Sequence, residues 1–186
     1  EFRSNRYPKD GPERIGAERF PIWNALYDEF QAVDLLRQLE EQKPYPVKAI
    51  MGFGMNAKML PETDKLLAAM ADNLDFFVNT DLFMTITCKY ADIVLPACSS
   101  VERGELKAYQ GGYLTFTKPV IEPLYESRSD VDIMCDLVRK MDLDDDLLKQ
   151  GYEACMDWII DGCGLTVADL KKSDMPVKVP IAKWPA

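Results

Sequence analysis

The sequence predicts an α/β fold, an open parallel sheet flanked by helices, with irregular N-terminal and C-terminal extensions. Three short apolar runs carry this prediction, at residues 47–53, 75–79 and 92–95. Short apolar runs of this kind are typical of strands that are buried on both faces. A helical segment lies between the first two runs, and strand–helix–strand repeats join parallel strands through right-handed crossovers. We therefore expect the three runs to be neighbouring parallel strands.

Apolar residues at helical spacing predict helices at residues 32–42, 61–73 and 129–141, and residues 144–160, which begin with three acidic residues, are expected to form a fourth. Pro61 suits the first turn of the second helix, because the proline nitrogen needs no hydrogen bond there. Ser129 can cap the third helix by accepting a hydrogen bond from a backbone N–H group. A shorter helix is expected at residues 83–90.

The remaining segments have weaker patterns. Residues 1–21 combine prolines and glycines with mixed charges and predict an irregular approach segment. Residues 104–112 are interpreted as a loop, residues 113–117 as an edge strand or hairpin arm, and residues 167–170 as a short helix before an extended tail. This gives three parts: an N-terminal extension and helix at 1–46, an α/β domain at 47–141, and a C-terminal helix and extended tail at 142–186.

Composition excludes several function classes. The 186 residues contain 22 Lys and Arg against 31 Asp and Glu, a net charge of −9, which argues against a nucleic-acid partner. No apolar stretch approaches the ~20 residues of a membrane span. Histidine is absent, which excludes a Ser-His-Asp triad and most zinc sites. The five cysteines are scattered and predict buried thiols rather than disulfides or a metal site.

Small residues follow the first predicted strand in the spacing G-x-G-x-x-A, at Gly52, Gly54 and Ala57. Such a turn lets backbone amides approach a pyrophosphate, as in a nicotinamide dinucleotide domain. Pro61 delays the following helix, however, so an ordinary strand–helix turn explains the spacing equally well. The turn presents Asn56 as its polar group.

Polar residues also stand at the ends of predicted elements. Thr80 and Asp81 follow the second strand, where ligands of open α/β sheets bind. A carboxylate there can accept hydrogen bonds from a guanine edge or from ribose, although Asp81 could equally cap the next short helix. Arg103 follows the third strand and can pair with a phosphate or carboxylate. Asp130 opens a helix, where its charge favours the positive helix end.

Three motifs, taken together, resemble the molybdopterin oxidoreductase family, the dimethyl-sulfoxide-reductase-like enzymes. They are VNTDLFMT at residues 78–85, ADIVLP at residues 91–96 with Glu102 beyond it, and SRSD at residues 127–130. The resemblance implies a Rossmann-like, dinucleotide-binding domain that holds one guanine dinucleotide tail of a bis(molybdopterin guanine dinucleotide) molybdenum or tungsten centre. It assigns no catalytic residue and no metal ligand to this chain.

The resemblance also implies the cofactor-binding residues, matched position by position: Asn56, Thr80, Asp81, Arg103 and Asp130. The family commonly has proline where this chain has Ala57, so the register of that loop differs. We expect all five residues to lie together at one edge of the sheet.

The matched stretch leads us to expect an internal piece of a larger enzyme, inactive on its own. The partners implied are the remaining domains of that parent and an electron-transfer subunit. A 4Fe-4S cluster of the parent would lie outside this chain. We expect a bacterial or archaeal protein, and the sequence does not distinguish a cytoplasmic from a periplasmic location. Two alternatives stay open at this point: an NAD(P)-binding domain of a dehydrogenase, and a non-enzymatic acidic interaction domain.

Overall fold

The computed structural model describes residues 13–27 and 29–180. The chain divides into two compact units, Glu1–Pro96 (unit 1) and Ala97–Ala186 (unit 2). Each unit has its own core of buried apolar residues. The division falls inside the range 47–141, which the sequence treats as a single domain.

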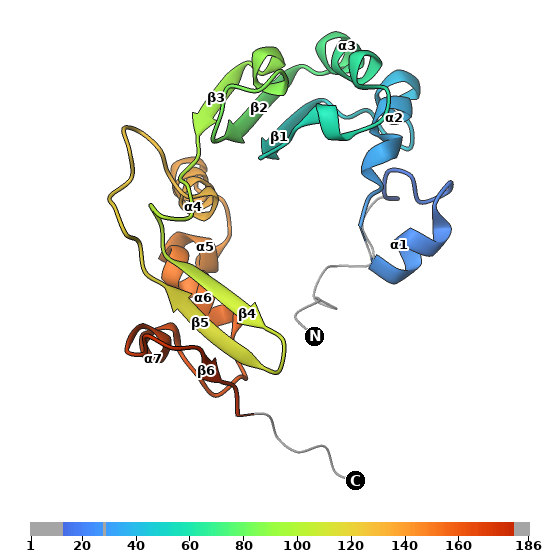
Figure 1. Ribbon diagram of the computed structural model, residues 1–186. Helices are drawn as coiled ribbons and strands as arrows, with labels where there is room; N and C mark the ends of the chain where they lie inside the picture. The colour runs from blue at the N-terminus through green and yellow to red at the C-terminus, as the bar shows by residue number, and fades with distance from the viewer. Residues whose placement is uncertain (1–12, 28, 181–186) are drawn as a thin grey trace. The chain divides into compact units, whose positions relative to one another are not determined.

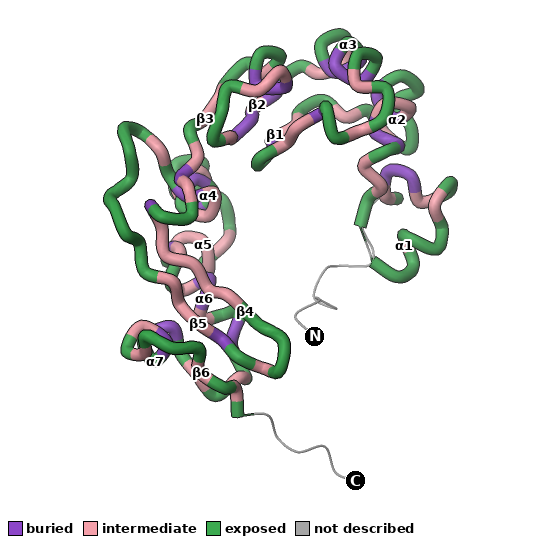
Figure 2. Tube along the Cα trace, in the orientation of Figure 1, coloured by how far each residue is buried: buried purple, intermediate pink, exposed green. Residues whose placement is uncertain are grey.

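Unit 1 contains the parallel sheet, and its strands run in the order β1-β2-β3 (Figure 1). Its elements are α1 (Pro21–Tyr27), η1 (Ala32–Asp34), α2 (Leu35–Glu41), β1 (Ala49–Phe53), η2 (Ala57–Met59), α3 (Thr63–Asn73), β2 (Phe76–Asp81), η3 (Thr87–Tyr90) and β3 (Ile93–Pro96). The three predicted strands and their parallel pairing are confirmed, as is the α/β fold class. Figure 2 shows the central strand β2 as buried along much of its length.

The core of unit 1 lies between the sheet and two helices. Leu35 and Leu39 of α2 are buried together with Leu66 and Met70 of α3 and with Phe77 of β2. These leucines and Met70 recur at helical spacing, so each helix presents one apolar side to the strands. Figure 1 shows α2 and α3 together on one side of the sheet.

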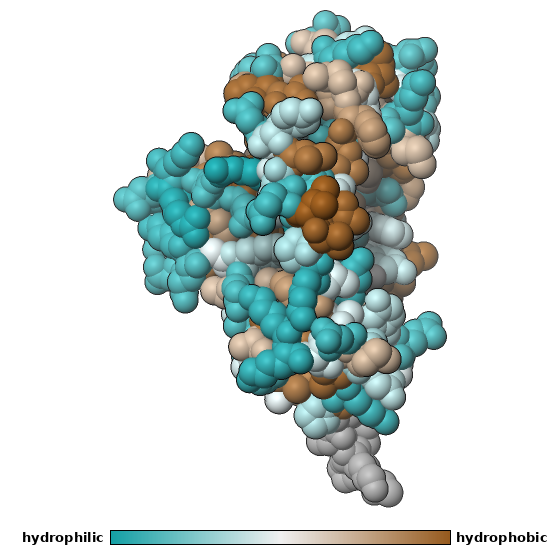
Figure 3. All heavy atoms as spheres, turned by 60° about the vertical axis from the view of Figure 1, so that its left-hand side comes forward, coloured by the Kyte–Doolittle hydropathy of each residue, from teal (hydrophilic) through white to brown (hydrophobic). Residues whose placement is uncertain are grey.

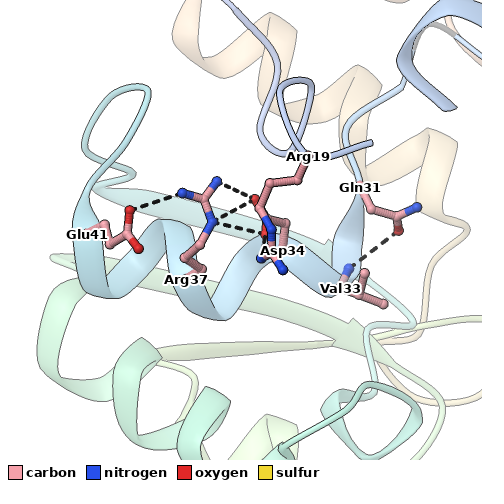
Figure 4. A network of polar contacts seen from close by, with 6 residues as sticks. All are labelled: Arg19, Gln31, Val33, Asp34, Arg37 and Glu41. Carbon is pink, nitrogen blue, oxygen red and sulfur yellow. Dashed lines mark hydrogen bonds and ion pairs between the residues drawn. The ribbon is translucent and has the colours of Figure 1, made fainter. Parts of the chain in front are cut away.

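A buried carboxylate fixes the segment before α2. Asp34 is 1% exposed, and both of its oxygens accept hydrogen bonds from Arg37 on the next helical turn, at 2.7–3.2 Å. Arg19, from the preceding segment, donates to the same carboxylate at 2.5 Å. Figure 4 shows both guanidinium groups turned toward Asp34, and Arg37 also reaches Glu41. Asp34 therefore ties residues 13–20 to α2.

The helix predicted at residues 83–90 is wrong in its first half, since only η3 is helical there. The Thr85 hydroxyl accepts the backbone N–H of Cys88 at 3.3 Å, and Thr85 N–H bonds to the Phe83 carbonyl at 2.8 Å. These local bonds occupy groups that a regular helix would use.

Within residues 97–180, unit 2 combines a small antiparallel sheet, in the order β4-β5-β6, with four helices. Its elements are β4 (Glu105–Tyr109), β5 (Tyr113–Thr117), α4 (Asp130–Met141), α5 (Asp146–Gln150), α6 (Tyr152–Ile159), α7 (Val167–Lys171) and β6 (Val177–Lys178). The helix α4 and its Ser129 cap are confirmed, because the Ser129 hydroxyl accepts from Asp132 N–H.

Two predictions for unit 2 are wrong. The segment 104–112 contains strand β4, which pairs with β5 as a hairpin. Gly111 and Gly112 have φ of 86° and 77°, the positive values that tight hairpin turns need. The single helix expected at 144–160 is broken at Gly151, whose φ of 102° separates α5 from α6.

Candidate functional site

The carboxyl ends of β1 and β2 bring three of the predicted site residues to one edge of unit 1. Phe53 pairs with Thr80, and Gly54 N–H bonds to the Thr80 carbonyl at 2.7 Å. The turn that carries Asn56 leaves β1 at this edge, and Asp81 ends β2 there. The structure therefore places Thr80 and Asp81 at the end of β2, and Asn56 in the turn that leaves the adjacent end of β1.

Local hydrogen bonds orient two of these side chains. Asn56 Oδ1 accepts the N–H of Lys58 at 3.1 Å, which caps η2. Asp81 Oδ1 accepts the N–H of Phe83 at 3.3 Å. Both side chains are partly exposed, so the same local bonds that fix them leave them accessible from solvent.

Two buried polar atoms lie beside them without a hydrogen-bond partner among the described residues: Asn79 Oδ1 and Thr80 Oγ1. Both residues are 0% exposed. A buried polar atom left unsatisfied costs about 1–3 kcal/mol, so such atoms are rare and mark strained or functional places. Sequence reasoning did not assign Asn79 to the site. The available signal was its polar side chain two residues after Phe77, on the buried face of β2.

Close packing and backbone conformation explain why the G-x-G-x-x-A turn has small residues. An added Cβ at Gly52 would lie 2.5 Å from Asn79 Oδ1 and 2.7 Å from Met55 Cβ. Gly54 has φ of 62°, in the left-handed region that glycine adopts without strain. Ala57 is fully buried, and its N–H bonds to Thr87 Oγ1 at 2.8 Å. The turn brings the backbone close to Asn79.

We expect Gly52→Ala to lower the free energy of unfolding by about 1–3 kcal/mol, as overpacked core positions do. Gly54→Ala should cost about 1–2 kcal/mol through left-handed strain alone, and Gly54→Asn, which tolerates that region, should cost less. Urea unfolding followed by circular dichroism measures all three. If Gly52→Ala left stability unchanged, the close approach of Asn79 to β1 would be contradicted.

The other two predicted site residues belong to unit 2 and lie near one another. Arg103 Nη1 is 3.8 Å from Asp130 Oδ2. Arg103 also donates from Nε to Glu105 Oε1 at 2.8 Å, so its charge is already partly balanced. Lys107 and Arg103, which donate to Glu105, hold the pKa of Glu105 below its usual value although burial opposes the shift. That all five residues share one edge stays a prediction, because the two groups lie in different units.

Unit 2 has a pocket of about 470 Å³ beside Arg103, lined also by Gly104, Ser127, Arg128, Asp132 and Tyr152. Burial raises the pKa of the Tyr152 hydroxyl. The pocket contains two arginines, but Arg128 is paired with Asp136 as Arg103 is with Glu105. Charge on its walls is therefore largely balanced.

Glu102 is the buried carboxylate of this pocket. Its Oε2 accepts from the backbone N–H and hydroxyl of Ser99, at 2.8 and 2.5 Å. Its Oε1 accepts from Leu124 N–H at 2.7 Å and from the Ser127 hydroxyl at 3.0 Å. These donors, the Ser99 hydroxyl first, lower the pKa of Glu102 to about 2. Glu102 thus joins two loops that are far apart in sequence.

The thiols agree with the expectation of buried cysteines at four positions, while Cys163 is partly exposed. Burial raises the pKa of Cys135 to about 11, which makes its thiolate scarce at neutral pH. Over the ranges 13–27 and 29–180, no cluster of three or more acidic, cysteine or histidine side chains is placed to hold a metal ion. None of the helices in those ranges has the length and apolar character of a membrane span.

Comparison with known proteins identifies relatives of this chain. It is 34% identical over 134 residues to "Probable oxidoreductase YoaE" of Bacillus subtilis (strain 168), which covers 71% of this chain and 20% of that relative. Trimethylamine-N-oxide reductase of Pasteurella multocida (strain Pm70) is 34% identical over 102 residues, 53% of this chain and 12% of the reductase. The chain therefore spans a fifth or less of the length of these two relatives.

The fold has a counterpart among solved structures. Acetylene hydratase from Pelobacter acetylenicus matches with a TM-score of 0.69 at 22% identity, over 86% of this chain and 25% of that one. A family model described as molybdopterin oxidoreductase matches residues 29–140, more than half of the chain. These findings do not favour the dehydrogenase and acidic-interaction alternatives. The chain belongs to the molybdopterin oxidoreductase family.

Proposed function

We propose that this chain is part of a larger molybdopterin-dependent oxidoreductase and helps to bind a guanine dinucleotide tail of its cofactor. Membership of the family and the small share of each relative that the chain spans support the first half of the proposal. The second half depends on one observation: two adjacent parallel strand ends place Asn56, Thr80 and Asp81 at one edge. Ligands of open α/β sheets bind at such edges.

The chemistry of this edge suits a guanosine diphosphate group. Guanine offers neighbouring N1–H and N2–H donors, which a carboxylate such as Asp81 accepts. The partly exposed Asn56 offers an amide beside this carboxylate. Asp130 is the second candidate carboxylate, but Arg103 lies 3.8 Å from it. The geometry therefore favours Asp81 over Asp130 as the carboxylate that accepts from guanine.

The same proposal assigns this chain no catalytic residue. Molybdenum or tungsten in the bound cofactor supplies the two-electron chemistry, and the residues of this chain hold and orient the nucleotide end. A 4Fe-4S cluster, an electron-transfer subunit and a bacterial or archaeal cytoplasmic or periplasmic location are proposed for the parent on the family resemblance alone.

Isothermal titration calorimetry of the 186-residue chain with GDP and with ADP tests the nucleotide site. We expect GDP to bind measurably more tightly than ADP. Asp81→Asn removes hydrogen bonds to a charged group, each worth about 1.5–3 kcal/mol, so GDP affinity should fall about 10–100-fold. Asp130→Asn tests the second carboxylate in the same way.

Asp72→Asn is the matched control. Asp72 is exposed near the end of α3, a helix that runs back to the opposite edge of the sheet, and the substitution changes charge in the same way. It should leave GDP affinity unchanged. Two results would contradict the guanine site: equal binding of GDP and ADP, or a GDP affinity that neither Asp81→Asn nor Asp130→Asn changes. The family assignment would stay intact in both cases.

A further inference from the structure

Unit 1 has a buried amide side chain, that of Asn79, in the central strand of its sheet. Apolar side chains at the surface, which Figure 3 shows among polar ones, are ordinary in a folded protein, whereas a polar side chain in the core is informative. Asn79 is 0% exposed, and β2, which contains it, pairs with a strand on each side. Asparagine is disfavoured in strands, where β-branched and aromatic residues pack better. Positions that break a local preference in this way are often functional.

The amide nitrogen of Asn79 joins two loops. Its Nδ2 donates to the Met55 carbonyl at 3.2 Å and to Cys88 Sγ at 3.2 Å. Met55 belongs to the turn after β1, residues 54–57, which is called the first loop. Cys88 ends the segment after β2, residues 82–88, which is called the second loop. An amide nitrogen carries two hydrogens, so a single side chain makes both bonds at once.

The second loop is tied down at the same sulfur. Cys88 is 2% exposed, and its Sγ accepts from the Thr85 hydroxyl at 3.3 Å and donates to the Phe83 carbonyl at 3.6 Å. A further bond joins the two loops directly, because Thr87 Oγ1 accepts Ala57 N–H at 2.8 Å. Buried polar networks of this kind rigidify the segments that they connect.

The oxygen of the same amide faces the backbone of β1. Asn79 Oδ1 has no hydrogen-bond partner among the described residues, and it lies 2.5 Å from the position that a Cβ would take on Gly52. The reverse orientation of the amide would place this oxygen against the Met55 carbonyl, with two acceptors facing each other. A buried acceptor without a partner is destabilising. What the amide contributes in return is the pair of bonds from Nδ2 to the loops.

We propose that Asn79 is a positioning residue, which fixes the first loop relative to the second and so fixes Asn56 relative to Asp81. Asn56 directly follows Met55, whose carbonyl the amide binds. Asp81 ends β2, and its Oδ1 accepts Phe83 N–H at 3.3 Å, in the second loop. Two side chains of the proposed guanine site thus have one common support. The role of this support in binding rests on the proposed function, whereas the link between the loops does not depend on a nucleotide.

Hydrogen-exchange mass spectrometry of the 186-residue chain tests the link without a nucleotide. Asn79→Ala removes both bonds, and Asn79→Asp keeps the size of the side chain but has at most one hydrogen to donate. We expect exchange in both loops to speed up together by about 10-fold in each variant. Asn73→Ala is the matched control, because the Asn73 amide donates to the Ala69 carbonyl at 2.9 Å, a bond within α3. It should leave exchange in both loops unchanged.

A double-mutant cycle separates positioning from a general loss of stability. Asn79→Ala, Asn56→Ala and the double variant are titrated with GDP by calorimetry. If Asn79 acts through Asn56, Asn79→Ala should lower GDP affinity about 10-fold in the otherwise wild-type chain and about 2-fold or less in the Asn56→Ala background. A merely structural role would give the same loss in both backgrounds.

Two outcomes would overturn the inference. Exchange that speeds up throughout unit 1, or in only one of the two loops, would mean that Asn79 does not link the loops. Equal losses of GDP affinity in the two backgrounds would mean that Asn79 does not act through Asn56. If GDP failed to bind the wild-type chain, the proposed function would be contradicted, and the exchange measurement would still decide whether Asn79 holds the loops together.

Discussion

Asp34→Ala is expected to lower the free energy of unfolding of unit 1 by about 2–3 kcal/mol. Removing one member of a buried ion pair costs about 3–5 kcal/mol when the partner charge stays buried. Here the Asp34 side chain is 0% exposed but Arg37 and Arg19 are 26% and 53% exposed, so solvent can partly compensate the two released arginines. The expected loss is therefore below the fully buried range.

Glu41→Ala is the matched control for Asp34. Glu41 binds the same Arg37 at 3.0 Å but is 45% exposed, and pairs of this kind are worth about 0.3–0.5 kcal/mol. Hydrogen-exchange mass spectrometry resolves the two units, so the loss of protection should appear in residues 13–41 and in α3. A similar loss for Asp34→Ala and Glu41→Ala would contradict the buried role of Asp34.

Acid should remove the same stabilisation. Hydrogen bonds from Arg37, and then from Arg19, lower the pKa of Asp34 from 3.8 although burial opposes the shift. A carboxylate whose pKa is lower in the folded state stabilises above its unfolded value and stops stabilising as pH falls through the folded value. The difference between wild type and Asp34→Ala should therefore shrink below about pH 4.

The parallel sheet could be predicted because its determinants are local. Residues 47–53 form an apolar run between Pro46 and Gly54, residues 76–78 are apolar as well, and the buried leucines of α3 repeat at helical spacing. The boundaries differ by a few residues. For example, α3 begins at Thr63 because Glu62 has φ of 53°, which a helix does not allow.

The misread elements depend on the backbone around glycine and on pairing partners distant in sequence. Strand β4 is a strand because it pairs with β5, and the short alternation of polar Glu105 and Lys107 with Leu106 is too brief to specify that pairing. Gly151 could have continued a helix at modest cost, and nothing in the neighbouring sequence specifies φ of 102° there. In both β4 and the break at Gly151, tertiary structure overrides the local propensity of the sequence.

The candidate site could be predicted from the sequence only where it coincides with the ends of predicted strands. Thr80 and Asp81 were identified because polar residues follow an apolar run, and the register of β1 and β2 places Asn56 beside them. The unsatisfied state of Asn79 Oδ1 depends on the close approach of Gly52 and Met55, which no linear pattern specifies. The family motif also identified Glu102 without giving its role.

Glu102→Gln is expected to loosen the loops of unit 2 that Glu102 joins. The carboxylate accepts four hydrogen bonds, from Ser99 N–H and hydroxyl, Leu124 N–H and the Ser127 hydroxyl. An amide keeps one oxygen but replaces the other by an NH₂ group, which cannot accept from two donors. Two donors then lose their acceptor at the wall of the pocket beside Arg103. Hydrogen exchange should speed up at residues 99–102 and 120–128, with unit 1 unchanged.

The pH dependence separates this role from a mere change of net charge. The pKa of Glu102 is about 2 when folded, against an ordinary value of 4.5. Because the folded pKa is the lower one, Glu102 stabilises unit 2 above about pH 5 and stops stabilising as pH falls toward about 2, with about one proton taken up on unfolding in between. The difference in unfolding midpoint between wild type and Glu102→Gln should therefore shrink over that range. Glu126 is an exposed carboxylate on the same loop, and Glu126→Gln should leave hydrogen exchange in unit 2 unchanged at pH 7. Equal behaviour of Glu102→Gln and Glu126→Gln at pH 7 would mean that the two loops are held together by contacts other than this carboxylate.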